Sequence, residues 1–158
     1  MDTDELFVFI HILAAFWYVM GLTAVQVALA RGWRAEEMKV KADSFDEAAH
    51  YQGVLLVPGA IAAVATGLFL WARLDYNLVA TGWLVLLEAL YVLTLLVCLP
   101  LTGLGLRRVR LAALKARKGG RTDQELDQAM ADGVPLVFSG LATILVPAMT
   151  FLSIFRPF

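Results

Sequence analysis

Hydrophobic residues occur in four long runs along the chain, and polar residues are concentrated at the N-terminus and between the runs. The runs cover residues 6–30, 51–72, 79–102 and 134–155. Each is close to the ~20 residues that cross about 30 Å of hydrocarbon as an α-helix. Apolarity is continuous within each run and does not alternate, which favours helices over barrel strands. The pattern predicts an all-α protein, a four-helix transmembrane bundle.

The composition agrees with a membrane protein. Of 158 residues, 60% are hydrophobic and 17% are charged, whereas a soluble domain carries roughly 45–50% apolar and about 25% charged residues. This length suits one bundle, so residues 1–158 are expected to form a single membrane domain. The one cysteine, Cys98, excludes an internal disulfide and any CxxC motif.

The first run is predicted to be a true span and not a cleaved signal peptide. The residues before it are acidic, with Asp2, Asp4 and Glu5, whereas a signal peptide begins with a positively charged region. The run is also longer than the 7–15 apolar residues of a signal peptide.

Basic residues are distributed unevenly between the two sides of the predicted bundle. Four lie in segment 31–50 and seven in segment 103–133, which makes eleven of the 13 Lys and Arg residues. Only Arg73 and Arg156 fall on the opposite side. Because cytoplasmic loops carry the excess of Lys and Arg, these two segments are predicted to be cytoplasmic loops. Both termini are then predicted to lie outside.

The second predicted loop contains helix signals. The third helix is expected to continue to about Lys118, where Gly119 and the glycine after it stop it. Thr122 and Glu125 form a capping box for a further short helix. Gly133 is expected to end that helix just before the fourth span.

Two uses of the basic stretch 107–121 are open. It could bind anionic lipid headgroups, at about 1 kcal/mol per basic residue near the surface, or it could serve only to set the topology. The second use is favoured because Asp123, Glu125 and Asp127 follow the stretch closely. Nothing in the sequence indicates nucleic-acid binding.

Small residues and prolines predict how the spans pack. Gly59, Ala63 and Gly67 recur every four residues, so they form a stripe that allows another helix to approach closely. A packing role is favoured over a ligand role. Each proline within or next to a span removes one backbone hydrogen bond, and kinks are expected at Pro58, Pro100 and Pro147.

The chain has one candidate site, because ionisable side chains inside a membrane are costly and are functional candidates by default. His11 in the first span and Glu88 in the third both lie roughly 8 Å below the outer interface, at 1.5 Å per residue. Thr66 on the second span and Met149 with Thr150 on the fourth fall in the same layer. The sequence therefore places these side chains at one depth in the outer leaflet.

Three interpretations of this layer are open. His11 and Glu88 could bond each other, or a backbone carbonyl freed by Pro147, and so fix the order of the helices. The layer could instead hold a cofactor or small molecule, with Tyr18 on the same helix face as His11. It could also be part of a proton or ion path. Met149 by itself is more typical of core packing than of a ligand.

The histidine count limits how a haem could be bound. The only other histidine, His50, is predicted at the inner end of the second span, about 25 Å from the level of His11. One haem held by both histidines of one chain is therefore excluded. His11 with Met149, His11 alone, or His11 from two copies remain open. Copper could use the same His and Met, but two ligands are few for a copper site.

No catalytic residues can be assigned from the sequence. No nucleophile–base pair, phosphate-binding loop or zinc motif is found. Whether the chain is an enzyme is left open.

Several short motifs of the chain are familiar: residues 6–17 followed by Gly21, Pro58-Gly59 with Thr66-Gly67, Trp83, and Met149-Thr150-Phe151 with Arg156-Pro157. In these motifs the chain resembles an uncharacterised family of bacterial four-helix membrane proteins. That family is similar in turn to CopD-type copper-resistance proteins and HemJ-type protoporphyrinogen oxidases.

This resemblance implies the bacterial cytoplasmic (inner) membrane as location and a first-helix histidine that binds b-type haem in some relatives. Of that haem site only His11 carries over. HemJ-type enzymes also use a lysine inside the membrane, and no predicted span here contains one. CopD-type proteins offer more His and Met than this sequence does.

We therefore expect a small multi-pass membrane protein that binds b-type haem, and no other cofactor, in the outer half of the bundle, with a redox or electron-transfer role. His11 is the expected metal ligand, with Met149, Glu88, Tyr18 and Thr66 around the cofactor. The alternative is a non-catalytic accessory or assembly subunit of a larger membrane complex. Besides the lipid bilayer, a homo-oligomer or such a complex is the expected partner. A channel or transporter fits poorly, because two ionisable residues in four spans make no continuous path.

Overall fold

In a computed structural model of the chain, residues 3–74, 81–119 and 124–157 are described, and every regular element within these ranges is helical. Two short π-helical segments, η1 and η2, interrupt the α-helices. The elements are α1 (Thr3–Arg34), α2 (Met38–Tyr51), η1 (Gln52–Leu56), α3 (Val57–Leu74), α4 (Gly82–Leu93), η2 (Thr94–Cys98), α5 (Leu99–Gly119), α6 (Gln124–Ala131) and α7 (Val134–Phe155).

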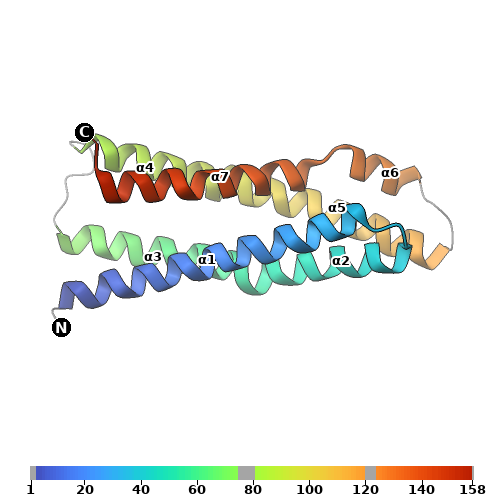
Figure 1. Cartoon of the computed structure of the whole chain (residues 1–158), viewed down its shortest axis with the longest axis horizontal. Coiled ribbons are helices and arrows are strands. Elements are labelled where there is room, and N and C mark those ends of the chain that lie inside the picture. Colours follow the sequence, from blue (N-terminus) through green and yellow to red (C-terminus); the bar gives the residue numbers. More distant parts are fainter. Residues whose placement is uncertain (1–2, 75–80, 120–123, 158) are drawn as a thin grey trace.

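The helices form an elongated bundle of four antiparallel rods (Figure 1). α2, η1 and α3 run as one continuous rod, and α4, η2 and α5 run as another. Both termini lie at one end, here called the terminal end. α1 connects to α2 at the opposite end, here called the loop end. Helices long and apolar enough to cross a membrane cover Thr3–Arg34, Met38–Arg73, Gly82–Gly119 and Gln124–Phe155, so the predicted all-α four-helix membrane fold is confirmed.

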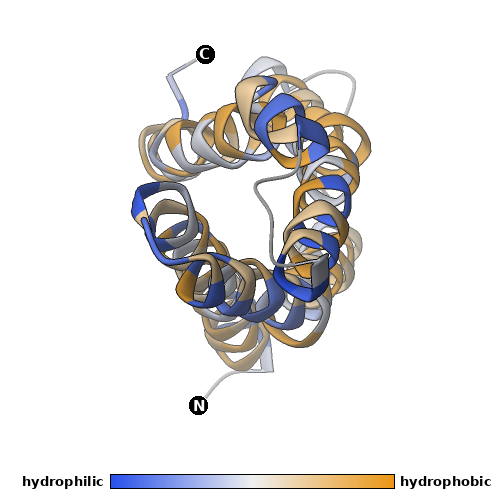
Figure 2. Ribbon diagram, turned by 90° about the vertical axis from the view of Figure 1, so that its right-hand side faces the viewer, coloured by the Kyte–Doolittle hydropathy of each residue, from blue (hydrophilic) through white to orange (hydrophobic). Residues whose placement is uncertain are grey.

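The rods are longer than a bilayer is thick. Those of 32, 36 and 38 residues extend about 48, 54 and 57 Å at 1.5 Å per residue, against about 30 Å of hydrocarbon. The excess lies at the loop end, where hydrophilic residues colour the turns nearest the viewer in Figure 2. Segment 31–50, predicted as a loop, is thus mostly the helix α2, whose buried residues Ala42, Phe45 and Ala48 pack into the bundle.

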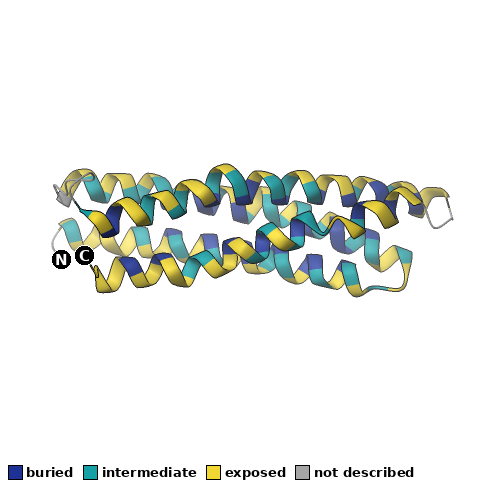
Figure 3. Cartoon of the chain, turned by 90° about the horizontal axis from the view of Figure 1, so that it is seen from above, coloured by how far each residue is buried: buried dark blue, intermediate teal, exposed yellow. Residues whose placement is uncertain are grey.

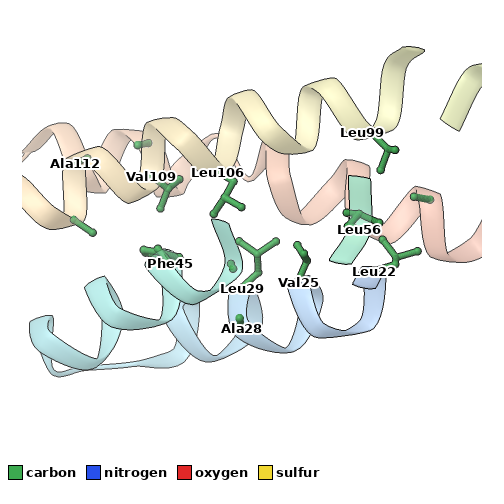
Figure 4. Packing of buried hydrophobic residues seen from close by; sticks show 14 of the residues in the cluster. Leu22, Val25, Ala28, Leu29, Phe45, Leu56, Leu99, Leu106, Val109 and Ala112 are labelled. Atoms are coloured by element: carbon green, nitrogen blue, oxygen red, sulfur yellow. The ribbon is translucent and has the colours of Figure 1, made fainter. Parts of the chain in front are cut away.

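The best-packed part of the core also lies toward the loop end, and Figure 3 shows the outer faces of all rods exposed. Phe45 of α2, Leu29 of α1, Leu56 of η1 and Leu106 of α5 are fully buried. Phe45, Leu29 and Leu106 lie close together, and Leu56 lies further along the bundle, beside Leu22 (Figure 4). Gly32 makes room for the Phe45 ring, because a Cβ atom there would stand 2.5 Å from Cε1 of Phe45. This packing fixes α1, α2 and α5 as one unit.

Ion pairs surround this unit. The Asp46 carboxylate lies 2.6 Å from Arg110 and the Asp43 carboxylate 2.7 Å from Arg117, so α2 is tied to α5. Further ion pairs are Arg31–Glu47, Arg108–Asp132 and Lys115–Glu125. Most of the described basic side chains of stretch 107–121 are therefore neutralised by carboxylates of this chain, which leaves little of the stretch for a broad headgroup-binding patch.

The small-residue stripe packs against α1, so its predicted packing role is confirmed. A Cβ atom at Gly59 would stand 2.7 Å from the backbone nitrogen of Tyr18. Ala63 is buried, and Gly67 lies against the His11 ring. We call this contact the α1–α3 seam. Because α1 covers the stripe, the stripe is not a docking surface for another subunit.

The segments before Pro58 and Pro100 are π-helical. η1 ends two residues before Pro58, and η2 ends two residues before Pro100. The amide of Val57 donates to the Gln52 carbonyl five residues earlier, and that of Leu99 donates to Thr94. A proline lacks the N–H that the preceding turn needs, and a π-turn rearranges that part of the hydrogen-bond ladder. Pro147 lies inside α7.

The second predicted loop behaves largely as its sequence indicates. α5 ends at Gly119, and the short helix α6 follows it. Gly133 adopts a left-handed conformation with φ of 59°, and Pro135 occupies the first turn of α7. The predicted capping residue Thr122 lies outside the described residues.

Candidate functional site

A hydrogen bond to α3 holds His11 at the α1–α3 seam. Its Nδ1 atom lies 2.9 Å from Oγ1 of Thr66 on α3. Both side chains are partly buried. The sequence predicted only that the two residues share a depth, and the structure joins them directly.

The direction of this bond follows from the single proton of the Thr66 hydroxyl. Oγ1 of Thr66 lies 2.7 Å from the Ala62 carbonyl of its own helix, and a carbonyl can only accept. The hydroxyl proton is therefore donated to Ala62, and His11 donates Nδ1–H to Thr66. In the neutral imidazole, this leaves Nε2 as the nitrogen with a free lone pair. The ring also lies close to the Ala63 backbone carbonyl, on the same helix as Thr66.

The surroundings of the ring are small and apolar. Gly67 lies beneath it, since a Cβ atom there would stand 3.2 Å from Cε1 of His11. Toward the terminal end, the rings of Phe7 and Phe69 stack at 4.3 Å between centroids. Beyond them Arg73 donates a 3.0 Å hydrogen bond to Asp4. These contacts close the seam above His11.

Glu88 does not pair with His11. It is half-buried on α4, which packs mainly against α7, whereas α1 packs mainly against α3. No hydrogen bond or ion pair of Glu88 is found among residues 3–74, 81–119 and 124–157. The structure gives His11 a partner on α3, Thr66, in place of Glu88 or a carbonyl freed by Pro147, because equal depth does not fix the direction in which a side chain leaves its helix. The role of such a bond in fixing the order of the helices stays a prediction.

Met149 and Thr150 lie on α7. Met149 is buried, with 8% of its surface exposed. Thr150 is exposed and donates to the Val146 carbonyl of its own helix at 2.9 Å. The role of Met149 as a second ligand therefore stays a prediction. The Thr150 hydroxyl bonds within its own helix.

Tyr18 lies seven residues beyond His11 on α1, about 10 Å along the axis. It is 4% exposed, and its hydroxyl has no hydrogen-bond partner among the described residues. It lies near Tyr91 and Cys98. The hydroxyl of Tyr91 donates to the Ala60 carbonyl at 3.3 Å. This buried polar group forms a second level, deeper than His11.

One polar contact inside the bundle was missed by the sequence analysis. Nε2 of Gln26 donates to the Ser139 carbonyl at 2.9 Å and ties α1 to α7. The signal was available, because Gln26 is an amide inside the first apolar run. Such interhelical bonds are common in membrane bundles, so this contact is assigned to packing.

His50 is exposed at the end of α2. It precedes Thr66 by 66 − 50 = 16 residues on the same rod, or about 24 Å. Because His11 bonds Thr66, the two histidines of one chain are too far apart to hold one haem, as predicted. Within the described ranges no three His, Cys, Asp or Glu side chains gather as a metal site.

Together the fold and this polar seam define an integral membrane protein of four long helices. The chain belongs to the family described as "Predicted integral membrane protein (DUF2269)", whose model matches residues 5–157. Neither the curated proteins nor the solved structures that were compared include a match.

Proposed function

We propose that this protein binds b-type haem, which Nε2 of His11 would hold through its iron. The hydrogen bond from Nδ1 to Thr66 carries the proposal. Ligating histidines usually donate their other nitrogen to an oxygen, which fixes the tautomer and the ring orientation. A neutral imidazole in an apolar setting suits haem iron. Bound haem would supply one-electron redox chemistry, consistent with a role in electron transfer.

The residues near His11 would position the group. Gly67 packs against the imidazole and would hold the ring in place, and the Phe7–Phe69 pair would limit water access from the terminal end. A second ligand would come from Met149, which is buried on α7, or from His11 of a second copy. The haem content distinguishes the two: one haem per chain for the first, one per two chains for the second.

The proposed setting is the cytoplasmic membrane of a bacterium, with both termini outside. It rests on the basic residues of segments 31–50 and 103–133 and on the resemblance to the CopD-like and HemJ-like proteins. In this orientation the site lies in the outer leaflet. Glu88 would be a polar neighbour of the cofactor contributed by α4.

The test is an absorption spectrum, oxidised and dithionite-reduced, of the protein purified in mild detergent from haem-replete cells. We expect a Soret band and sharp α and β bands after reduction. His11→Ala should abolish them, and His50→Ala is the matched control that should keep them. A colourless wild-type protein, or a spectrum unchanged in His11→Ala, would overturn the proposal.

The alternative is a non-catalytic accessory subunit. The exposed side chains of Phe9, Leu13 and Phe16 on α1 favour it, since they form one apolar face on which another helix could pack. It predicts a colourless protein that co-purifies with a partner. Isolation only as a monomer would count against it.

A further inference from the structure

A groove with a volume of about 610 Å³ runs between the two rods that contain the π-turns. One wall comes from η1 and α3 and the other from η2 and α5. Its body is apolar and includes Val57, Ile61, Leu95 and Leu99. The groove is separate from the His11 seam, which α1 and α3 form together.

The mouth of the groove is polar. Gln52 and Arg107 line it at the loop end. The Gln52 amide packs on Gly103, where a Cβ atom would stand 2.6 Å from Nε2 of Gln52. Arg107 follows Gly103 by one helical turn, about 6 Å. The groove therefore has a cationic mouth and an apolar body.

Arg107 differs from the other arginines of α5. Arg108, Arg110 and Arg117 each pair with a carboxylate of this chain. Arg107 is exposed and forms no ion pair or hydrogen bond with any residue in the described ranges. Among the described residues, then, this cation has no counter-ion, and it lies over an apolar groove.

The level of the mouth matches the lipid headgroups. The third apolar run ends at Thr102, and Arg107 lies five residues further, about 8 Å. The headgroup layer adds roughly 5–8 Å to each side of the hydrocarbon. From Arg107 back to Leu95 the wall is twelve residues long, about 18 Å, comparable to the roughly 15 Å of hydrocarbon in one leaflet.

We propose that this groove binds one anionic phospholipid, with the phosphate group at Arg107 and Gln52 and one acyl chain between α3 and α5. An apolar channel alone would accept any acyl chain. The exposed guanidinium of Arg107 adds a preference for an anionic headgroup, because Arg forms strong, often bidentate hydrogen bonds with phosphate. The π-turns on both walls belong to the site, as π-bulges often do.

The test is native mass spectrometry of the full chain in detergent, with phosphatidylglycerol or phosphatidylcholine of identical acyl chains added. We expect one phosphatidylglycerol per chain to be retained and phosphatidylcholine to be lost at the same collision energy. Arg107→Ala should weaken phosphatidylglycerol retention about five-fold, the factor that corresponds to roughly 1 kcal/mol. Lys118→Ala, which removes a charge further along α5, should not.

A second pair of variants tests the channel. Ile61→Trp fills the groove from an exposed position and should reduce retention, whereas Ile144→Trp on the exposed face of α7 should not. Equal retention of both lipids, or wild-type retention by Arg107→Ala, would overturn the proposal. The wild type could instead be a lipid-free dimer that Ile61→Trp converts to a monomer. That result would make the groove an interface with a second copy and would also overturn the proposal.

Discussion

Gly21 of α1 lies directly against the backbone of Leu56, the last residue of the π-turn η1. A Cβ atom at residue 21 would stand 2.5 Å from the Leu56 nitrogen. Gly59 makes the reciprocal contact one turn further, against the backbone of Tyr18. The closest approach of α1 to its neighbour therefore depends on two glycines, one from each rod.

The first prediction concerns these glycines. Gly21→Ala and Gly59→Ala should each lower the free energy of unfolding by about 1–3 kcal/mol, because the atoms next to each glycine belong to the backbone and cannot rotate away. Unfolding in mixed detergent–SDS micelles measures the change. Gly140→Ala is the control, because a Cβ atom there meets nothing within 4 Å. This change should leave the free energy of unfolding unchanged or raise it by up to about 1 kcal/mol.

The second prediction tests the hydrogen bond between His11 and Thr66. Thr66→Val keeps the shape of the side chain but removes the acceptor of Nδ1–H, so haem affinity should fall about 10–100-fold. Thr66→Ser keeps the oxygen and should bind haem nearly as the wild type does. Titration of the haem-free protein, followed at the Soret band, measures both. Equal affinities for the Val and Ser variants would show that this bond does not support a ligand.

The third prediction concerns the ion pair between Asp46 and Arg110. It is partly exposed, so its coupling energy should be small, about 0.2–1 kcal/mol, and should decrease with salt. A double-mutant cycle with Asp46→Asn and Arg110→Gln measures it. A coupling above roughly 2 kcal/mol would mean that the pair is shielded from water by something the isolated chain lacks.

The fourth prediction concerns Gln26. Gln26→Leu should destabilise the bundle by about 0.6–1.7 kcal/mol, the range of interhelical bonds in membranes, because it removes the donor to the Ser139 carbonyl. Unfolding in mixed micelles again gives the value. Thr23→Val is a matched control, since the Thr23 hydroxyl only bonds the Val19 carbonyl of its own helix. If Gln26→Leu lowers the free energy of unfolding no more than the control does, the bond between α1 and α7 does not stabilise the bundle.

Hydrophobic pattern and helix-end residues predicted much of the fold. Four continuous apolar runs specify membrane helices because lipid leaves the backbone no other partner. Gly119 and Gly133 mark helix ends through their own backbone preferences, which need no tertiary information. The Gly59–Gly67 stripe predicted a close helix contact because period and residue size are local properties.

Side-chain direction was harder to predict. The depths of His11, Thr66 and Glu88 follow from counting residues, but the rotation of each helix about its axis depends on packing along its whole length. The pairing of His11 with Thr66 could therefore not be separated from a pairing with Glu88. α2 was missed as a helix because its apolar residues, such as Phe45, are interspersed with charged ones and gain their burial from α1 and α5.

The length of α5 also has a consequence for whatever approaches the membrane from the water. If the hydrocarbon ends at Thr102, as the sequence predicts, the helix continues for 119 − 102 = 17 residues to Gly119, about 26 Å. Ion pairs and the Phe45 core hold α2 alongside it. The bundle thus carries a rigid stalk well clear of the lipid, and an aqueous protein arriving on that side would meet its tip before it reached the bilayer.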